Sequence, residues 1–248
     1  MAQILPQANK LVRALASQIG RTLESPDADA VHDLRVAIRR YSQLLTALDS
    51  APKPVRRRLK ALMHFAGDVR DCDISSKLVR KAGASQTLLR RLVRRRGIAE
   101  RLLVVELQTW KDSAGWRTPL NDGSPDRRLL DKALKRVLKR AKAAEKSDKQ
   151  LHPLRIAAKK LRYTMELVAP ADSRMELIRE LQRQLGDIND YETAWRMAGE
   201  EAAPRRLIVA LHERRDKKIR SFRRCWRREF NPGLTAAAPA KNGKEPRP

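Results

Sequence analysis

The sequence predicts an all-α protein made of two similar halves, and three observations support this. Leu, Ala, Arg, Lys and Glu dominate the composition, and these residues favour helices. Long β-branched runs bounded by turn residues, which would indicate strands, are absent from the sequence. Two long stretches of the chain also repeat one another. The chain has 248 residues, 42% of them hydrophobic and 4% aromatic, which is enough for a large, mainly aliphatic core.

The repeat is clearest in two pairs of segments. Residues 31–48 read VHDLRVAIRRYSQLLTAL and residues 151–168 read LHPLRIAAKKLRYTMELV, a shift of 120 residues. GDVRDCD at 67–73 matches GDINDYE at 186–192 with a shift of 119. A nearly constant shift over this length indicates a duplicated unit. At a shift of 120 the aligned pairs include His32 with His152, Arg94 with Arg214, and Arg95 with Arg215.

Each unit is interpreted as four helices. In the first unit we expect them at residues 6–24, 27–49, 54–82 and 85–112. In the second unit we expect them at residues 125–147, 149–169, 172–199 and 203–229.

Local signals support the helices of the first unit. Ser25 and Pro26 precede the second helix as a cap followed by a proline in the first turn. Pro54 opens the third helix, and Gly67 predicts a kink within it. The first helix has an apolar stripe at helical spacing that consists of Leu11, Leu15, Ile19 and Leu23.

Turn residues divide the chain into segments. TPLNDGSPD at 118–126 is the clearest linker, so residues 1–117 form the first half and 118–124 the connection. The second half then covers residues 125–230. Residues 231–248 are small, polar and contain proline, and we expect them to be disordered.

The charge indicates an anionic partner. The formal net charge is +26 at pH 7, and a globular domain so basic repels itself. Nucleic acid, an anionic membrane surface or another polyanion would each explain the excess. The N-terminal residues do not resemble a signal peptide, and no apolar run has membrane-spanning length. Cys72 and Cys225 show no zinc spacing, so we expect a reduced, cytoplasmic protein that has no membrane contact.

The repeated segment places cations on one face of a helix. At about 100° per residue, His32, Arg35 and Arg39 form a stripe opposite the apolar face. No acidic residue lies within the stripe, although like charges at this spacing repel. A bound anion would relieve the repulsion, and the guanidinium fork matches phosphate oxygens. The second unit repeats the stripe with His152, Arg155, Lys159 and Arg162.

Other basic residues have less certain roles. A lone histidine on a helix is more often structural, but His32 and His152 are the only histidines shared between the units. The fourth-helix arginines would either complete a basic wall or simply be exposed, and both interpretations stay open. They are Arg94, Arg95, Arg214 and Arg215.

These segments resemble the signature of CHAD domains, the conserved histidine α-helical domains. The resemblance covers roughly residues 5–230, and the GD-x-x-D segments fit the same pattern. It implies two antiparallel four-helix bundles related by a pseudo-twofold axis, with a basic central cavity that binds inorganic polyphosphate, and location at polyphosphate granules. The residues it implies for binding are His32, Arg35, Arg39, Arg40, His152, Arg155, Lys159, Lys160 and Arg162.

The sequence departs from that pattern in places. Ser42 stands where Arg162 stands in the other half, and Ile156 occupies a position that is often lysine in the family. The two walls of the cavity should therefore differ in charge. The chain also has no room for the triphosphate-tunnel domain to which some CHAD domains are joined, so it is similar to the stand-alone members.

Two other functions would each suit part of this pattern. A nucleic-acid-binding protein would fit the charge, but the chain has few aromatic residues for stacking, so only incidental binding is expected. A metal-dependent phosphoryl-transfer enzyme would need its repeated acids to hold magnesium, whereas pairing with arginines is the more usual role. We therefore expect no catalytic residues, metal or cofactor. The repeated acids are Asp68, Asp71, Asp73, Asp187, Asp190 and Glu192.

Overall fold

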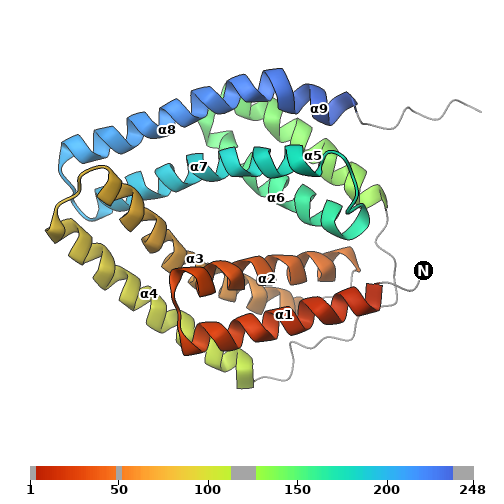
Figure 1. The fold of residues 1–248 in the computed structure, drawn as a ribbon, viewed down its shortest axis with the longest axis horizontal. Coiled ribbons are helices and arrows are strands. Elements are labelled where there is room, and N and C mark those ends of the chain that lie inside the picture. Colours follow the sequence, from red (N-terminus) through yellow and green to blue (C-terminus); the bar gives the residue numbers. More distant parts are fainter. Residues whose placement is uncertain (1–3, 49–51, 113–126, 237–248) are drawn as a thin grey trace, which may run out of the picture.

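The computed structural model describes residues 4–48, 52–112 and 127–236, and these residues form helices and no strand (Figure 1). This confirms the all-α prediction. The predicted connection at 118–124 lies outside the described residues. Within the described part of the chain, no helix combines the length and the apolarity needed to cross a membrane.

The first half contains α1 to α4, coloured red to yellow in Figure 1. Their bounds are α1 Ile4–Glu24, α2 Ala28–Ala47, α3 Lys53–Lys81 and α4 Gln86–Asp112. The second half contains α5 Arg127–Lys146, the 3₁₀ turn η2 Asp148–Gln150, α6 Leu151–Val168, α7 Met175–Glu200 and α8 Arg205–Cys225. It ends with the π-helical turn η3 Trp226–Phe230 and α9 Asn231–Ala236.

The start of α2 fixes the position of the basic stripe. The Asp27 carboxylate accepts hydrogen bonds from the backbone N–H groups of Asp29 and Ala30, at 2.9 and 2.8 Å. Asp27 is therefore the cap, and Pro26 precedes the helix instead of occupying its first turn. His32 consequently lies just over one turn into α2, at the end where the helix N-terminus favours anions.

Three apolar clusters hold the helices together. One is formed by α1 to α4 and one by α5 to α9, so each half has its own core. A third cluster joins the α3–α4 end of the first half to the α7–α8 end of the second, through residues such as Leu92 and Leu211. Helices α2 and α6 also contact one another, as do α3 and α7. In each half, helices that follow one another in the chain pack together: α1 with α2, α2 with α3 and α3 with α4, and likewise α5 with α6, α6 with α7 and α7 with α8. The pseudo-twofold axis between the halves stays a prediction.

The C-terminal segment corrects one prediction. Residues 231–236, expected to be disordered, form α9. Phe230 and Leu234 are fully buried in the second core, and Gly233 lies so close to Leu177 that an added Cβ would be 2.6 Å from its Cδ2. Burial of these two apolar side chains orders a segment whose composition favours disorder. Residues 237–248 lie outside the described part of the chain.

Candidate anion-binding cavity

A large cavity lies between the two halves. Its volume is about 1080 Å³, and it is lined by residues of α2 and α3 from the first half and α6 and α7 from the second. The two basic stripes face this cavity instead of opposite outer surfaces. The predicted residues that line it are His32, Arg35, Arg39, Arg40, His152, Arg155, Lys159 and Arg162.

Two further cations were missed from the sequence. Arg70 of α3 and Arg196 of α7 also line the cavity. Arg70 belongs to the repeated GDVRDCD segment, but its counterpart Asn189 is uncharged, so the repeat did not draw attention to it. Arg196 also pairs with Glu200 of its own helix at 2.5 Å, so part of its charge is offset.

Carboxylates line the same cavity, but fewer of them. Among the described residues, eight Lys and Arg side chains line it against five carboxylates, so a positive excess remains. Burial raises the pKa of Asp71 and of Asp190, although Arg35 and Arg155 respectively oppose that shift. Neither Asp71 nor Asp190 has an ion pair within 4 Å among the described residues. The stripes are therefore only partly neutralised by neighbouring helices.

The central cations are crowded and short of partners. Burial, and then the charge of Arg39, lowers the pKa of Arg35 to about 10. Burial also lowers the pKa of Arg155. In the described part of the chain, Nη1 of Arg35 and Nε of Arg155 are buried with no hydrogen-bond partner. Unpaired buried donors cost about 1–3 kcal/mol each, and the repulsion between these cations adds to that cost. A bound anion would offset the repulsion.

Lys159 is the most strongly perturbed group of the cavity. Burial, followed by the charges of Arg155 and Arg39, lowers its pKa to about 6. Lys159 is therefore mostly uncharged at neutral pH while the cavity is empty. An incoming anion would favour its protonated form, because opposite charges raise the pKa of an amine.

A glycine makes room for Arg35. A Cβ at Gly67 would lie 2.8 Å from Nη1 of Arg35, whereas a Cβ at the repeat-related Gly186 would meet nothing within 4 Å. Helix α3 is unbroken through Gly67, where a kink was predicted. The glycine of the first GD-x-x-D segment thus lets the Arg35 guanidinium lie directly against α3.

A family model described as CHAD domain matches residues 7–199, more than half of the chain. The chain belongs to the CHAD domain family. The fold also resembles the crystal structure of the CHAD domain from the plant Ricinus communis, with a TM-score of 0.66 and 19% identity over 93% of this chain and 90% of that one. PptA from Streptomyces chartreusis is similar too, with a TM-score of 0.62 and 17% identity over 90% of this chain and 99% of that one. A search of curated proteins found no significant match.

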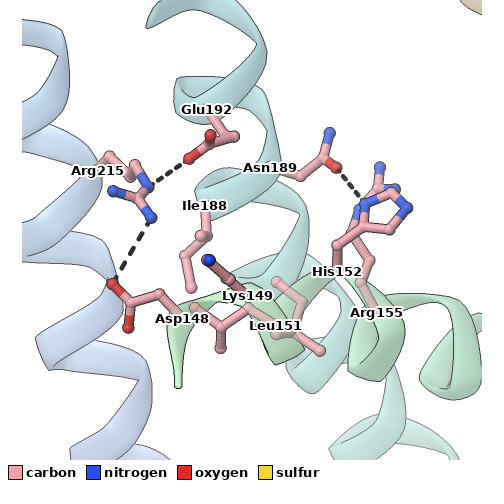
Figure 2. Close-up of a pocket in the computed structure, with 10 residues that line it drawn as sticks. Asp148, Lys149, Leu151, His152, Arg155, Ile188, Asn189, Glu192 and Arg215 are labelled. Carbon is pink, nitrogen blue, oxygen red and sulfur yellow. Dashed lines mark hydrogen bonds and ion pairs between the residues drawn. The ribbon is translucent and has the colours of Figure 1, made fainter. Parts of the chain in front are cut away.

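The two histidines of the CHAD signature have different surroundings. Nδ1 of His152 lies 3.3 Å from Oδ1 of Asn189 (Figure 2). In the first half Arg70 replaces Asn189, and partial removal from water together with the Arg70 charge lowers the pKa of His32. Both side chains are exposed at the cavity wall.

Arg40 and Lys160 differ from the central residues. Nε of Arg40 lies 3.3 Å from Oε2 of Glu166, which also pairs with Nε of Arg162 at 3.4 Å. Arg40 therefore connects α2 to α6, and its charge is partly offset at the edge of the CHAD cavity. Lys160 does not line the central cavity but faces two smaller cavities beside it.

The fourth-helix arginines lie away from the cavity. Arg95 pairs with Glu200 at 2.7 Å and Glu201 at 3.4 Å. Figure 2 shows Arg215 directed toward Glu192 and Asp148, at 2.5 and 3.6 Å, with His152 at the other end of that 540 Å³ pocket. Arg94 is exposed and Arg214 partly buried, and none of the four is among the described residues that line the central cavity.

The alignment of these arginines needs a correction. Arg96 pairs with Asp73 at 2.7 Å, just as Arg215 pairs with the repeat-related Glu192. Arg96, rather than Arg95, therefore corresponds to Arg215, and the fourth helices keep the shift of 119 residues set by the GD-x-x-D segments. The arginine of this pair holds the fourth helix against the third in each half.

The repeated acids mostly have cationic neighbours. Asp73 and Glu192 pair with Arg96 and Arg215, and Asp187 pairs with Lys218 at 2.7 Å. Asp68 lies 3.7 Å from His64. Among the residues that the structure describes, no group of three or more His, Cys, Asp or Glu side chains is placed to hold a metal ion.

Proposed function

We propose that this CHAD domain binds inorganic polyphosphate in its central cavity, without chemical conversion of the chain. One observation carries the proposal: Arg35 and Arg39 of one half and Arg155 of the other line the same cavity, where their charges repel one another. Each phosphate unit of polyphosphate brings one negative charge and several acceptor oxygens. Such a chain would supply the countercharge, and its oxygens would be acceptors for the guanidinium N–H groups that face the cavity.

The lining favours polyphosphate over nucleic acid. Base stacking needs exposed aromatic rings, and Tyr163 is the only Phe, Tyr or Trp among the described residues of the cavity lining. Tyr163 is only 5% exposed. Arg162 also lies over its ring, 4.6 Å from the centroid. The cavity thus offers charge and hydrogen-bond donors but no free aromatic face for a base.

A salt-dependent titration tests the proposal. If the cavity neutralises about five phosphates, log K should fall with log salt at a slope of roughly −3 to −4, as in other linear single-stranded polyanions. Polyphosphate should bind more tightly than RNA at equal phosphate concentration, and orthophosphate weakly. RNA that displaces polyphosphate at equal phosphate concentration would contradict the proposal. Release of orthophosphate in the presence of Mg²⁺ would contradict the absence of chemistry.

The glycine beside Arg35 provides a subtler prediction. Gly67→Ala should weaken polyphosphate binding roughly tenfold, because its Cβ displaces the Arg35 guanidinium and one charge-assisted contact is worth about 1.5 kcal/mol. Helix stability should rise, since alanine is favoured over glycine by about 1 kcal/mol within a helix. Fluorescence titration and thermal unfolding measure the two effects.

The matched control is Gly186→Ala, at the repeat-related position of α7. It brings the same gain in helix propensity, but its Cβ meets nothing within 4 Å. Gly186 also lines the central cavity, but an added methyl group there displaces no cation, so binding should change less than in Gly67→Ala. Equal weakening by both substitutions would mean that Gly67 has no special relation to Arg35.

Binding to polyphosphate would also determine where the protein is found. On this proposal, the protein collects at polyphosphate granules in cells that contain them. A fluorescent fusion should follow the granules, and the same fusion with Arg35 and Arg155 changed to glutamine should not.

A further inference from the structure

The central cavity continues into two smaller ones. A second cavity of about 510 Å³ shares Arg39 and Lys159 with the central cavity, and it adds Lys60 of α3 and Lys160 of α6. A third cavity of about 220 Å³ shares Lys160 with the second and adds Lys132 and Arg136 of α5. The three cavities therefore adjoin one another through shared lining residues and lead from the centre of the molecule to the exposed face of α5.

The charges along this path differ from those of the central cavity. No Asp or Glu is among the described residues that line the second and third cavities, whereas five carboxylates line the central one. Ser42 and Ile156, where the sequence departs from the CHAD pattern, line the second cavity. Five basic residues among the described lining of the path lie outside the central cavity: Arg56, Lys60, Lys132, Arg136 and Lys160. The last four of these, Lys60, Lys132, Arg136 and Lys160, are called the basic track below.

Cations of the basic track lack acidic partners. In residues 4–48, 52–112 and 127–236, none of the four forms an ion pair within 4 Å. Exposed arginines elsewhere, such as Arg183 and Arg196, do pair with neighbouring carboxylates. Burial, followed by the charges of Arg136 and Lys132, lowers the pKa of Lys160, so these cations lie close enough to repel one another. A row of unpaired cations without acids is suited to a linear anion.

We propose that a long polyphosphate chain leaves the central cavity along the basic track, so that the protein binds long chains more tightly than short oligophosphates. This rests on the proposed function, since the chain must first occupy the central cavity. The carboxylates that line the central cavity would repel a polyphosphate chain that left it in another direction. The basic track presents only cations to the chain. The end of a long chain would lie against Lys132 and Arg136 on the exposed face of α5.

The test compares tripolyphosphate with a polyphosphate of about a hundred units. The variant Lys132→Gln/Arg136→Gln should lose roughly 3- to 30-fold in affinity for the long chain, the range expected for two exposed charge contacts. Its affinity for tripolyphosphate should not change, because neither residue lines the central cavity. Titrations at one salt concentration give both values.

The control variant is Lys217→Gln/Arg220→Gln on α8, which removes the same two charges from exposed positions that line none of the cavities described above. It should bind both ligands like the wild type. An equal loss of long-chain affinity in both variants would overturn the track, since net charge alone would then explain it. So would a loss of tripolyphosphate affinity in the α5 variant, or an unchanged affinity of that variant for the long chain.

Failure of the proposed function would appear differently. A wild-type protein that binds neither ligand, or an Arg35→Gln/Arg39→Gln variant that binds both normally, would contradict the central cavity itself. Normal tripolyphosphate binding that depends on Arg35 and Arg39, together with no effect of Lys132→Gln/Arg136→Gln, would remove only the track.

Discussion

Polyphosphate binding is expected to be lost when the four central cations are changed to glutamine. Each charge-assisted hydrogen bond contributes about 1.5–3 kcal/mol, so even two lost contacts would weaken binding roughly a hundredfold or more. Glutamine keeps much of the aliphatic side chain and has a helix propensity like that of arginine and lysine. The four residues are Arg35, Arg39, Arg155 and Lys159, which line both the central and the second cavity.

The same variant should be at least as stable as the wild type. The substitutions remove repulsion between buried cations and remove the unpaired Nη1 of Arg35 and Nε of Arg155. A gain of about 1 kcal/mol would raise the melting temperature by roughly 2–4 °C in a protein of this size. Thermal unfolding followed by circular dichroism measures it. A large fall in melting temperature would mean that the stripes hold the fold together.

A matched variant distinguishes the effect of the cavity charges on binding from the effect of the protein's net charge. Three arginines and one lysine on α8 are exposed, and changing them to glutamine removes at least as many positive charges as the cavity variant does: Arg205, Arg206, Lys217 and Arg220. This control should retain polyphosphate binding within a few-fold. If the control loses binding as completely as the cavity variant, polyphosphate affinity depends on the net charge of the protein and the cavity has no special role.

Polyphosphate affinity is expected to fall as pH rises above about 6. The pKa of Lys159 is lowered to about 6 in the free protein, so above that pH Lys159 must take up a proton when the anion binds. Proton uptake by one group weakens binding by up to about tenfold per pH unit within the window between its free and bound pKa values. Below about pH 6 Lys159 is already charged, and this contribution levels off.

Other groups of the cavity act in the same direction. The pKa of His32 is lowered, so it too would gain a proton beside an anion. The pKa values of Asp71 and Asp190 are raised, and an anion would raise them further. The charges that act on Lys159 come from Arg35 and Arg39 of α2, Arg155 of α6 and Asp190 of α7.

Lys159→Arg isolates the contribution of one residue. Arginine stays charged throughout this pH range, so the variant should bind with a weaker pH dependence and a smaller proton uptake. Titration calorimetry in buffers with different ionisation enthalpies measures the uptake. An unchanged uptake in Lys159→Arg would show that Lys159 is already charged in the free protein.

Lys159 should also affect the unfolding free energy of the unliganded protein. Its pKa is about 6 when folded and near 10.5 in the unfolded chain, so the unfolded state binds more protons between these values. Its charge therefore destabilises the fold as pH falls through that window, and the unfolding free energy attributable to Lys159 rises with pH. Denaturant titrations of wild type and Lys159→Arg at several pH values compare this slope.

Much of the cavity could be predicted from the sequence because the essential residues lie on one helix in each half. The 3.6-residue period separates Arg35 and Arg39 from the apolar face of α2. The repeat then identifies Arg155 and Lys159 as their counterparts on α6. A stripe of cations without acidic residues can be recognised from the sequence and the helical period alone.

The residues that were missed or misplaced depend on packing between helices. Arg70 and Arg196 reach the cavity only because α3 and α7 cross beside it, which no local pattern reports. Arg95 and Arg96 are adjacent arginines, and only the ion pair with Asp73 identifies which of them matches Arg215. The order of residues 231–236 likewise comes from docking on a distant core.

The apolar cluster shared by the α3–α4 and α7–α8 ends is a part of the core that neither half completes by itself. Cut from its neighbour, the first repeat would expose Leu88 and Leu92 to water, and the second would expose Leu211 and Met197. A protein made of one such repeat could cover those side chains only by forming a homodimer. Within one chain each repeat covers the other's apolar side chains, while positions such as Arg70 and Asn189 differ between the two.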